Sequence, residues 1–220
     1  MPRKDDFDSQ FCLTKREYLE KNDFLNWYRY FHLIQDIIRL QPQRVLEIGA
    51  GAGIVKNCLQ SIVAHYEVLD INASLAPDYV ADIRQLQPQL KDRYDCIVVA
   101  DVVEHVPFSD LAVCLANMRE YLAGRGRILI TIPHRRSHFL FMTPTYHPHV
   151  VTVPTGFLSP GAFYRRFIKR KIWIDPHHCW EIGDGKSKRA DVERVFDQAG
   201  FQREKVKKLL YVDYWILRKE

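Results

Sequence analysis

The chain has 220 residues, of which 47% are hydrophobic and 27% are charged, and its formal net charge is +5. This length allows one well-buried core, and the composition is ordinary for a soluble globular protein. The five cysteines are widely spaced and include no CxxC pair, which argues against a disulfide framework or a zinc knuckle and favours a reducing, cytoplasmic setting. The sequence has no apolar N-terminal region and no apolar run of ~18–20 residues, so we expect neither a secretion signal nor a membrane span.

The N-terminal residues 1–43 are expected to be helical. Thr14 and Glu17 have the spacing of a capping box, and apolar residues then recur at helical spacing from Phe24 to Ile38. Gln41 precedes a proline and ends the helical pattern. We treat this segment, a core over 44–132, an insertion over 133–185 and a C-terminal part over 186–220 as one domain.

Residues 44–132 alternate apolar strands with helices. Strands are expected at 44–48, 66–70, 79–82, 94–100 and 127–132, and a helix that begins near Ser109 ends before Gly124. Near-continuous apolar strands that alternate with helices are typical of a doubly wound parallel sheet.

The C-terminal part predicts a helix that begins at Ser187 and ends at Gly200, followed by strands at 205–211 and 214–217. The two residues between these strands are too few for a parallel crossover, so the last strand must run antiparallel to its neighbour. We therefore predict an α/β fold with a Rossmann-like, seven-stranded, mostly parallel sheet, an antiparallel C-terminal hairpin strand, and helices on both faces.

A glycine turn at 49–53 separates the first strand from the first helix, where a ligand can reach the backbone. A dinucleotide site needs glycine or alanine at position 54, and this chain has Ile54 there. Glu47 would also repel a pyrophosphate, whereas it would attract the ammonium and sulfonium of S-adenosylmethionine. These residues disfavour an NAD(P)-linked oxidoreductase and favour S-adenosylmethionine as the cofactor.

Acidic residues end successive predicted strands. Asp70 lies 19 residues after Gly51 and suits the two ribose hydroxyls, while Asp82 suits the adenine amino group. Asp101 ends the fourth strand at the switch point of the sheet, where open α/β sheets bind ligands. The predicted cofactor-binding residues are Glu47, Gly49, Ala50, Gly51, Asp70, Ile71, Asp82, Ile83, Asp101 and Val102.

These stretches resemble the motifs of class I S-adenosylmethionine-dependent methyltransferases. VLEIGAGAG at 45–53 resembles motif I, 68–70 resembles motif II, and 80–83 resembles the adenine-binding stretch. Residues 95–107 and 126–133 resemble the type 11 group, which includes the ubiquinone-biosynthesis O-methyltransferases. The resemblance covers about 44–133 and the C-terminal hairpin; it implies the cofactor and leaves the acceptor open.

The insertion over 133–185 fits no regular element in the sequence pattern, and we interpret it as an acceptor-binding cap. A hydroxyl acceptor benefits from a histidine base, so the catalytic candidates are His105, His134 and His178. For His105 the alternative is a packing residue that braces the cofactor loop. A metal held at 177–179 with the histidines at 147 and 149 is disfavoured, because adjacent histidines in a strand point to opposite faces, and we predict no metal.

A basic aromatic stretch at 163–173 leaves three interpretations. We favour a cap helix that packs its apolar side on the core, then contact with an anionic membrane that supplies a lipid-like acceptor, with nucleic acid least favoured. The predicted function is methyl transfer to oxygen or nitrogen of a small-molecule acceptor by a monomer or weak homodimer. The alternatives are a non-catalytic cofactor- or partner-binding protein of the same fold, and an RNA methyltransferase.

Overall fold

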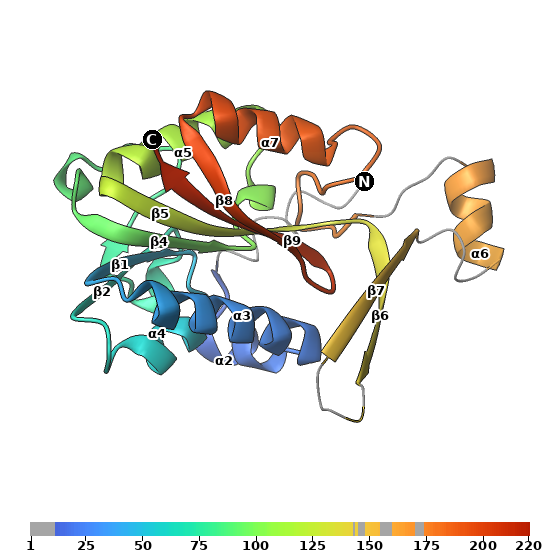
Figure 1. Ribbon diagram of the computed structural model, residues 1–220, viewed down its shortest axis with the longest axis horizontal. Coiled ribbons are helices and arrows are strands. Elements are labelled where there is room, and N and C mark those ends of the chain that lie inside the picture. The colour runs from blue at the N-terminus through green and yellow to red at the C-terminus, as the bar shows by residue number, and fades with distance from the viewer. Residues whose placement is uncertain (1–11, 143, 145–147, 155–159, 170–173) are drawn as a thin grey trace.

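The computed structural model describes residues 12–142, 144, 148–154, 160–169 and 174–220 (Figure 1). Its main sheet has seven strands in the order β3-β2-β1-β4-β5-β9-β8. The strands are β1 (Arg44–Ile48), β2 (His65–Asp70), β3 (Tyr79–Val80), β4 (Tyr94–Ala100), β5 (Leu122–Pro133), β8 (Phe201–Lys208) and β9 (Val212–Lys219). Strands β1 to β5 pair in parallel, and β9 runs antiparallel to both β5 and β8. The predicted fold class is confirmed.

Helices cover both faces of this sheet (Figure 1). The helices of one side are α2 (Lys15–Glu20), α3 (Phe24–Leu40) and α4 (Ile54–Leu59), and those of the other are α5 (Leu111–Tyr121) and α7 (Arg189–Gln198). Successive side chains of β9 point to opposite faces of the sheet. The Trp215 ring lies 5.4 Å from the Phe196 ring of α7, while the Tyr214 hydroxyl donates to Asp36 of α3 on the other face. Because both faces are buried, the strands read as continuous apolar runs.

The N-terminal helices form as predicted, with a break between them. The backbone N–H of Thr14 donates to the Glu17 carboxylate at 2.7 Å, which completes the capping box of α2. Asp23 caps α3 separately by accepting from the Asn26 N–H at 3.0 Å. Gln41 ends α3 in the left-handed conformation, directly before the proline.

Several predicted boundaries were displaced by local turns. Short 3-10 helices lie at Ala73–Leu75, Pro88–Leu90, Val103–His105 and Phe108–Asp110. The last of these delays α5 until Leu111, and an Asp184 carboxylate that binds the Ser187 N–H delays α7 until Arg189. Strand β3 has only two residues.

The expectation of no regular element over 133–185 was wrong. Strands β6 (Arg136–Met142) and β7 (Pro148–Pro154) pair antiparallel in a separate two-stranded sheet. A short helix α6 (Pro160–Phe163) continues into a π-helix (Tyr164–Ile168). The hairpin and α6 extend away from the main sheet (Figure 1), so no core burial imposes the apolar periodicity by which elements are recognised in a sequence.

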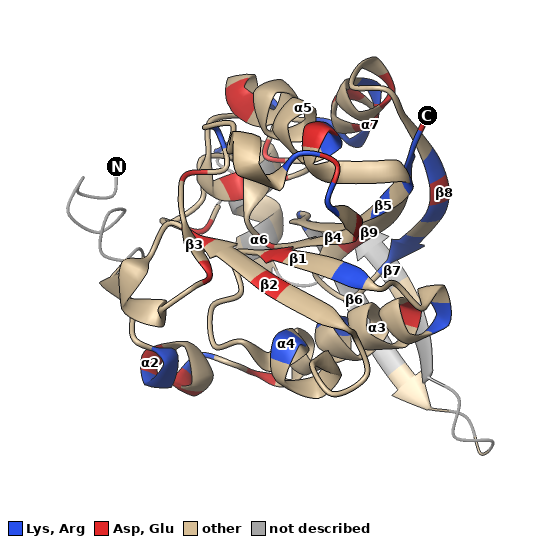
Figure 2. Cartoon of the chain, turned by 90° about the vertical axis from the view of Figure 1, so that its left-hand side faces the viewer, with Lys and Arg blue, Asp and Glu red and all other residues tan. Residues whose placement is uncertain are grey.

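Strand β8 is the exposed edge of the main sheet, and Figure 2 shows basic residues along it. Charged side chains on an edge strand oppose pairing with another chain. Among the residues that the structure describes, no helix is both long enough and apolar enough to cross a membrane.

Candidate functional site

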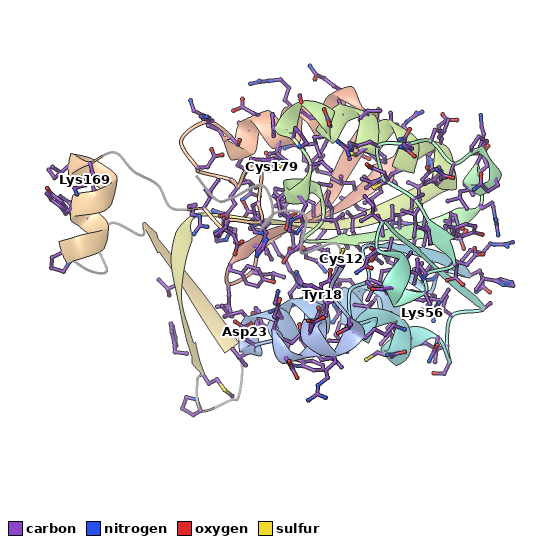
Figure 3. All side chains as sticks on the ribbon, turned by 180° about the vertical axis from the view of Figure 1, so that it is seen from behind. Cys12, Tyr18, Asp23, Lys56, Lys169 and Cys179 are labelled. Carbon is purple, nitrogen blue, oxygen red and sulfur yellow. The ribbon has the colours of Figure 1, made fainter. Side chains whose placement is uncertain are left out.

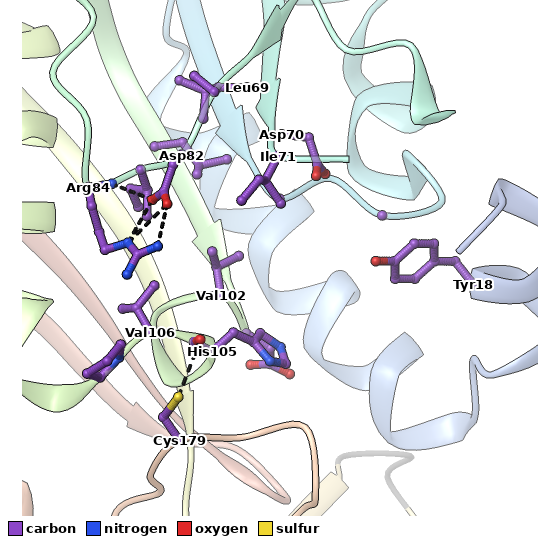
Figure 4. Close-up of a pocket in the computed structure, with 17 residues that line it drawn as sticks. Tyr18, Leu69, Asp70, Ile71, Asp82, Arg84, Val102, His105, Val106 and Cys179 are labelled. Carbon is purple, nitrogen blue, oxygen red and sulfur yellow. Dashed lines mark hydrogen bonds and ion pairs between the residues drawn. The ribbon is translucent and has the colours of Figure 1, made fainter. Parts of the chain in front are cut away.

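Two adjoining cavities lie where the order of the parallel strands reverses between β1 and β4. The larger holds about 540 Å³ and the smaller about 200 Å³, and both are lined by Tyr18, Gly49, Gly51 and Asp101. Tyr18 of α2 and Cys179 of the insertion stand on opposite sides of the larger cavity (Figures 3 and 4).

All of the predicted cofactor-binding residues line one or both of these cavities. Those of the larger cavity are Gly49, Gly51, Asp70, Ile71, Asp82, Ile83, Asp101 and Val102, and the smaller adds Glu47 and Ala50. Gly49 has a φ of 71°, and a Cβ there would overlap the Val102 side chain, so this position requires glycine. The structure thus brings together residues that are spread over 56 positions of the sequence, from 47 to 102.

Asp70 is fixed at the end of β2 with its carboxylate toward the larger cavity (Figure 4). One oxygen accepts the Asn72 N–H at 2.9 Å. Burial raises the pKa of Asp70, while the hydrogen bonds from backbone N–H groups oppose that rise. A carboxylate has about four acceptor positions, so this one retains capacity for ligand hydroxyls.

Asp82 shares its wall of the cavity with Arg84, which sequence reasoning missed. The guanidinium donates to Asp82 through Nη2 at 2.6 Å, and this hydrogen bonding lowers the pKa of the Asp82 carboxyl. Asn117 of α5 holds the same stretch from behind by donating to the Ile83 carbonyl at 2.9 Å. The backbone at 82–84, which lines this end of the larger cavity, is therefore anchored from two sides.

Two acidic residues with different electrostatic environments line the smaller cavity. Glu47 is buried and accepts from the Tyr66 hydroxyl at 2.9 Å, and burial raises its pKa to about 7. Asp101 instead forms an ion pair with Arg29 and accepts from Tyr211 at 2.8 Å. Sequence reasoning missed Arg29, whose only signal is a cation within the apolar pattern of α3.

His105 lines the larger cavity, as expected for a residue just after β4. Its Nδ1 lies 3.0 Å from the His177 carbonyl oxygen, and burial lowers its pKa to about 4, so the ring is neutral near pH 7. The His178 ring lies 4.9 Å from that of His105 in an edge-to-face arrangement. Glu104, which sequence reasoning did not single out, is fully buried beside them, and burial raises its pKa to about 8.

The end of the insertion is clamped over the loop that follows β4. The Cys179 N–H donates to the Glu104 carbonyl at 2.7 Å, and the Trp180 indole donates to the Val106 carbonyl at 3.0 Å. These contacts bring His178 to His105 across 73 positions of sequence. The predicted cap thus contributes a wall of the cavity through its last residues.

His134 is separated from the other two candidate histidines. It is buried, its backbone N–H donates to the Tyr211 carbonyl, and its Nε2 lies 3.4 Å from the Leu209 carbonyl oxygen. It lines neither cavity. This position favours packing under the β8–β9 turn. The catalytic role predicted for His134 from the sequence is untested.

The comparison with known proteins identifies the family. The model of the methyltransferase domain family matches residues 18–205. This chain belongs to that family. The resemblance to class I methyltransferases is therefore confirmed, whereas the likeness to the ubiquinone-biosynthesis enzymes stays a prediction.

Relatives of this methyltransferase domain differ in how much of the chain they match. A protein-L-isoaspartate O-methyltransferase from Roseiflexus castenholzii is 31% identical over 121 residues, which cover 49% of this chain and 53% of that protein. The chain thus spans about half the length of this curated relative.

Two solved structures match nearly the whole methyltransferase domain. The N-methyltransferase NodS from Bradyrhizobium japonicum, in complex with S-adenosylhomocysteine, has a TM-score of 0.62 at 13% identity and covers 100% of this chain and 99% of its own. The 1,6-didemethyltoxoflavin-N1-methyltransferase from Burkholderia thailandensis has a TM-score of 0.58 at 11% identity, with 98% and 84% covered. At these identities the likeness establishes the fold.

The basic aromatic stretch of this methyltransferase domain does not pack as expected. Four of its apolar side chains are 45–63% exposed in the structure: Phe163, Tyr164, Phe167 and Ile168. That exposure contradicts the interpretation of a cap helix with its apolar side on the core, and α6 stands apart from the sheet in Figure 3. Residues 170–173 and the histidine at 147 lie outside the described residues.

Proposed function

We propose that this chain is an S-adenosylmethionine-dependent methyltransferase that acts on an oxygen or nitrogen of a small-molecule acceptor. The observation that carries the proposal is the set of acids at the ends of successive strands, which surround two joined cavities beside one glycine turn. Binding of S-adenosylhomocysteine by two proteins of the same fold supports the same cofactor.

The cavity walls match the cofactor group by group. Asp70 would accept from the ribose hydroxyls, and Asp82 with the Ile83 N–H would meet the adenine edge, with Ile71 against its face. Glu47 and Asp101 would face the cationic methionine end in the smaller cavity. An anionic dinucleotide would bring its pyrophosphate to these same acids, so it fits less well.

The acceptor would enter from the side of His105 and Cys179, which line the larger cavity away from Asp70 (Figure 4). In the transfer an acceptor lone pair forms a bond to the methyl carbon as the carbon–sulfur bond breaks, and S-adenosylhomocysteine departs. A hydroxyl acceptor also loses its proton, and the neutral His105 ring is placed to receive it. Alignment in a closed cavity supplies much of the acceleration.

A lipid-like acceptor is the second candidate, because exposed apolar side chains from 163 to 168 accompany a run of basic residues in the sequence. We do not propose a protein L-isoaspartate acceptor from the likeness to the Roseiflexus castenholzii enzyme, because the match covers only about half of each chain.

Calorimetry with S-adenosylhomocysteine and with NADP tests the cofactor assignment. We expect binding of the first and no comparable binding of the second. Release of a labelled methyl group from S-adenosylmethionine to members of an acceptor panel then tests turnover. Tight NADP binding would contradict the proposal, and cofactor binding without turnover on any acceptor would favour the non-catalytic alternative.

A further inference from the structure

Three side chains with metal-binding groups meet beside the larger cavity. Glu104 and His105 belong to the 3-10 helix Val103–His105, and His178 comes from the end of the insertion. One ligand atom from each lies within 4.8 Å of the other two. Two histidines and one carboxylate form a donor set that zinc and other first-row divalent ions accept.

Glu104 is the unusual member of this cluster. Its side chain is fully buried, and both carboxylate oxygens lack a hydrogen-bond donor among the residues that the structure describes. His178 Nε2 lies 4.0 Å from a Glu104 carboxylate oxygen, which is too distant for a hydrogen bond. Buried carboxylates are normally paired or bound to a metal, so this one calls for a cation.

Both histidines are oriented in the manner of metal ligands. His105 Nδ1 lies 3.0 Å from the His177 carbonyl oxygen, and His178 Nδ1 lies 2.8 Å from a Glu181 carboxylate oxygen. Donation of Nδ1–H to these acceptors fixes the tautomer and leaves the Nε2 lone pair for a ligand. Glu181 is itself held by Arg135 and by the Asp175 N–H, so the outer contacts are fixed as well.

We propose that Glu104, His105 and His178 bind a divalent transition-metal cation, with zinc or manganese as the reference ions. Two ligands about 2.1 Å from one ion stand roughly 3–4 Å apart, so small side-chain rotations close the present spacing. This proposal replaces the prediction of no metal, which had considered the cluster at 177–181 with the histidines at 147 and 149. The missed signal is the adjacent Glu104 and His105 after β4.

The site also indicates an acceptor class, and this step rests on the proposed function. His105 lines the larger cavity, so a cation beside it lies at the acceptor end. Three protein ligands would leave coordination positions for the acceptor. A hydroxyl group bound to the ion there would have a lowered pKa and would lose its proton more easily. With the ion bound, His105 Nε2 is a ligand and no longer the proton acceptor, so the hydroxyl proton passes to solvent. The oxygen then attacks the methyl carbon, and the carbon–sulfur electron pair returns to sulfur. The proposed acceptor class is therefore a hydroxylated small molecule that chelates metal.

Titration of the metal-free protein with Co²⁺ or Mn²⁺ alone tests the site, read by visible absorption or by electron paramagnetic resonance. We expect one bound ion per chain, and a loss of affinity of at least about 100-fold in Glu104→Gln and in His178→Ala. Glu181→Gln should lose about 10–100-fold, because it removes only an outer-shell contact. His177→Ala is the matched control, because it keeps the backbone oxygen that holds His105 Nδ1, and it should bind the ion as the wild type does.

Glu104→Gln should fold about as well as the wild type, because it keeps the volume of a buried side chain whose carboxylate oxygens have no hydrogen-bond partner among the described residues. Equal ion affinity in wild type, Glu104→Gln and His178→Ala, or no bound ion in the wild type, would overturn the site. Ion binding with no methyl transfer would leave the site standing and contradict the proposed function. Methyl transfer that is insensitive to chelators and occurs with no bound ion would support the proposed function and contradict the metal site.

Discussion

Arg29 of α3 forms an ion pair with Asp101 at the end of β4, which joins the N-terminal helices to the centre of the sheet. Both side chains are largely buried, at 6% and 17% exposure. The Thr131 hydroxyl donates to the other Asp101 oxygen at 2.6 Å, so the carboxylate is fixed in one orientation. The residue itself adopts a left-handed φ of 56°, which these contacts must stabilise.

Removal of the Arg29 guanidinium should lower the stability of the fold and weaken ligand binding in the smaller cavity, which Arg29 lines. Arg29→Met keeps most of the side-chain volume and leaves the Asp101 charge without its main partner, which costs about 3 kcal/mol of unfolding free energy. Denaturant unfolding measures that loss, and calorimetry should show weaker S-adenosylhomocysteine binding. Tyr211→Phe is the comparison variant, because it removes the hydroxyl that contacts Asp101 and Asn26 but keeps the ion pair, and it should cost less, about 1.5 kcal/mol. An unchanged unfolding midpoint in Arg29→Met would contradict the role given to the ion pair.

Asp70 tests the ribose assignment. Asp70→Ala removes the acceptor of two hydroxyl hydrogen bonds, each worth roughly 1.5–3 kcal/mol to a charged group. Affinity for S-adenosylhomocysteine, measured by calorimetry, should fall at least about tenfold while the circular dichroism spectrum is kept. Asp197→Ala on α7 removes an acid that lines neither cavity and should bind S-adenosylhomocysteine normally. Equal affinity in the two variants would mean that the ribose binds elsewhere.

Glu47 gives stability a defined pH dependence. Burial raises its pKa from 4.5 to about 7, so the native state binds its proton more tightly than the unfolded state does. The stabilisation is full below about pH 4.5 and is lost as the pH rises through 7. Glu47→Gln should therefore gain about 1–3 kcal/mol over the wild type at pH 8 and little at pH 5.

Denaturant unfolding at the two pH values measures this difference. The same variant should bind S-adenosylmethionine more weakly at pH 8, because it removes the carboxylate that we propose faces the ammonium. A Glu47→Gln protein with the wild-type pH profile would show that Glu47 is ionised throughout this range.

The strand-end acids were predictable from the sequence because parallel strands bring their carboxyl ends to one edge of a sheet. Each acid follows its own apolar run, so Asp70 and Asp82 need no knowledge of distant contacts. Arg29 and Glu104 were not predictable, because their environments are built by partners about 70 positions away. The hairpin β6–β7 was missed since it lies off the core, where burial does not imprint a periodic pattern.

The exposed aromatic stretch predicts binding to an anionic membrane. Phe163 and Phe167 are about half exposed and their rings lie 4.8 Å apart. Phe163→Ser with Phe167→Ser should reduce co-sedimentation with phosphatidylserine vesicles, and high salt should release the wild type. Phe24→Ser with Phe31→Ser removes two rings of α3 that are more exposed than Phe163 and Phe167, and it is the control. Equal sedimentation of the two double variants would contradict a membrane role specific to this stretch.

Alanine substitutions of the three candidate histidines should affect turnover differently, according to where each histidine lies. His105 and His178 adjoin the larger cavity, whereas His134 lies under the β8–β9 turn. With a suitable acceptor, His105→Ala and His178→Ala should lower turnover roughly 10²–10⁴-fold, the range for loss of an acid–base or acceptor-activating group. Affinity for S-adenosylhomocysteine should stay nearly unchanged in His178→Ala, because His178 lines neither cavity.

His134→Ala should behave differently. Loss of a buried ring lowers the unfolding midpoint, but turnover per folded molecule should stay within a few-fold of the wild type, since no reacting group is removed. Single-turnover rates at saturating cofactor, with thermal unfolding of each variant, measure both effects. A 10²-fold turnover loss in a fully folded His134→Ala would restore this residue to catalysis, and the acceptor would then have to reach beneath the C-terminal hairpin.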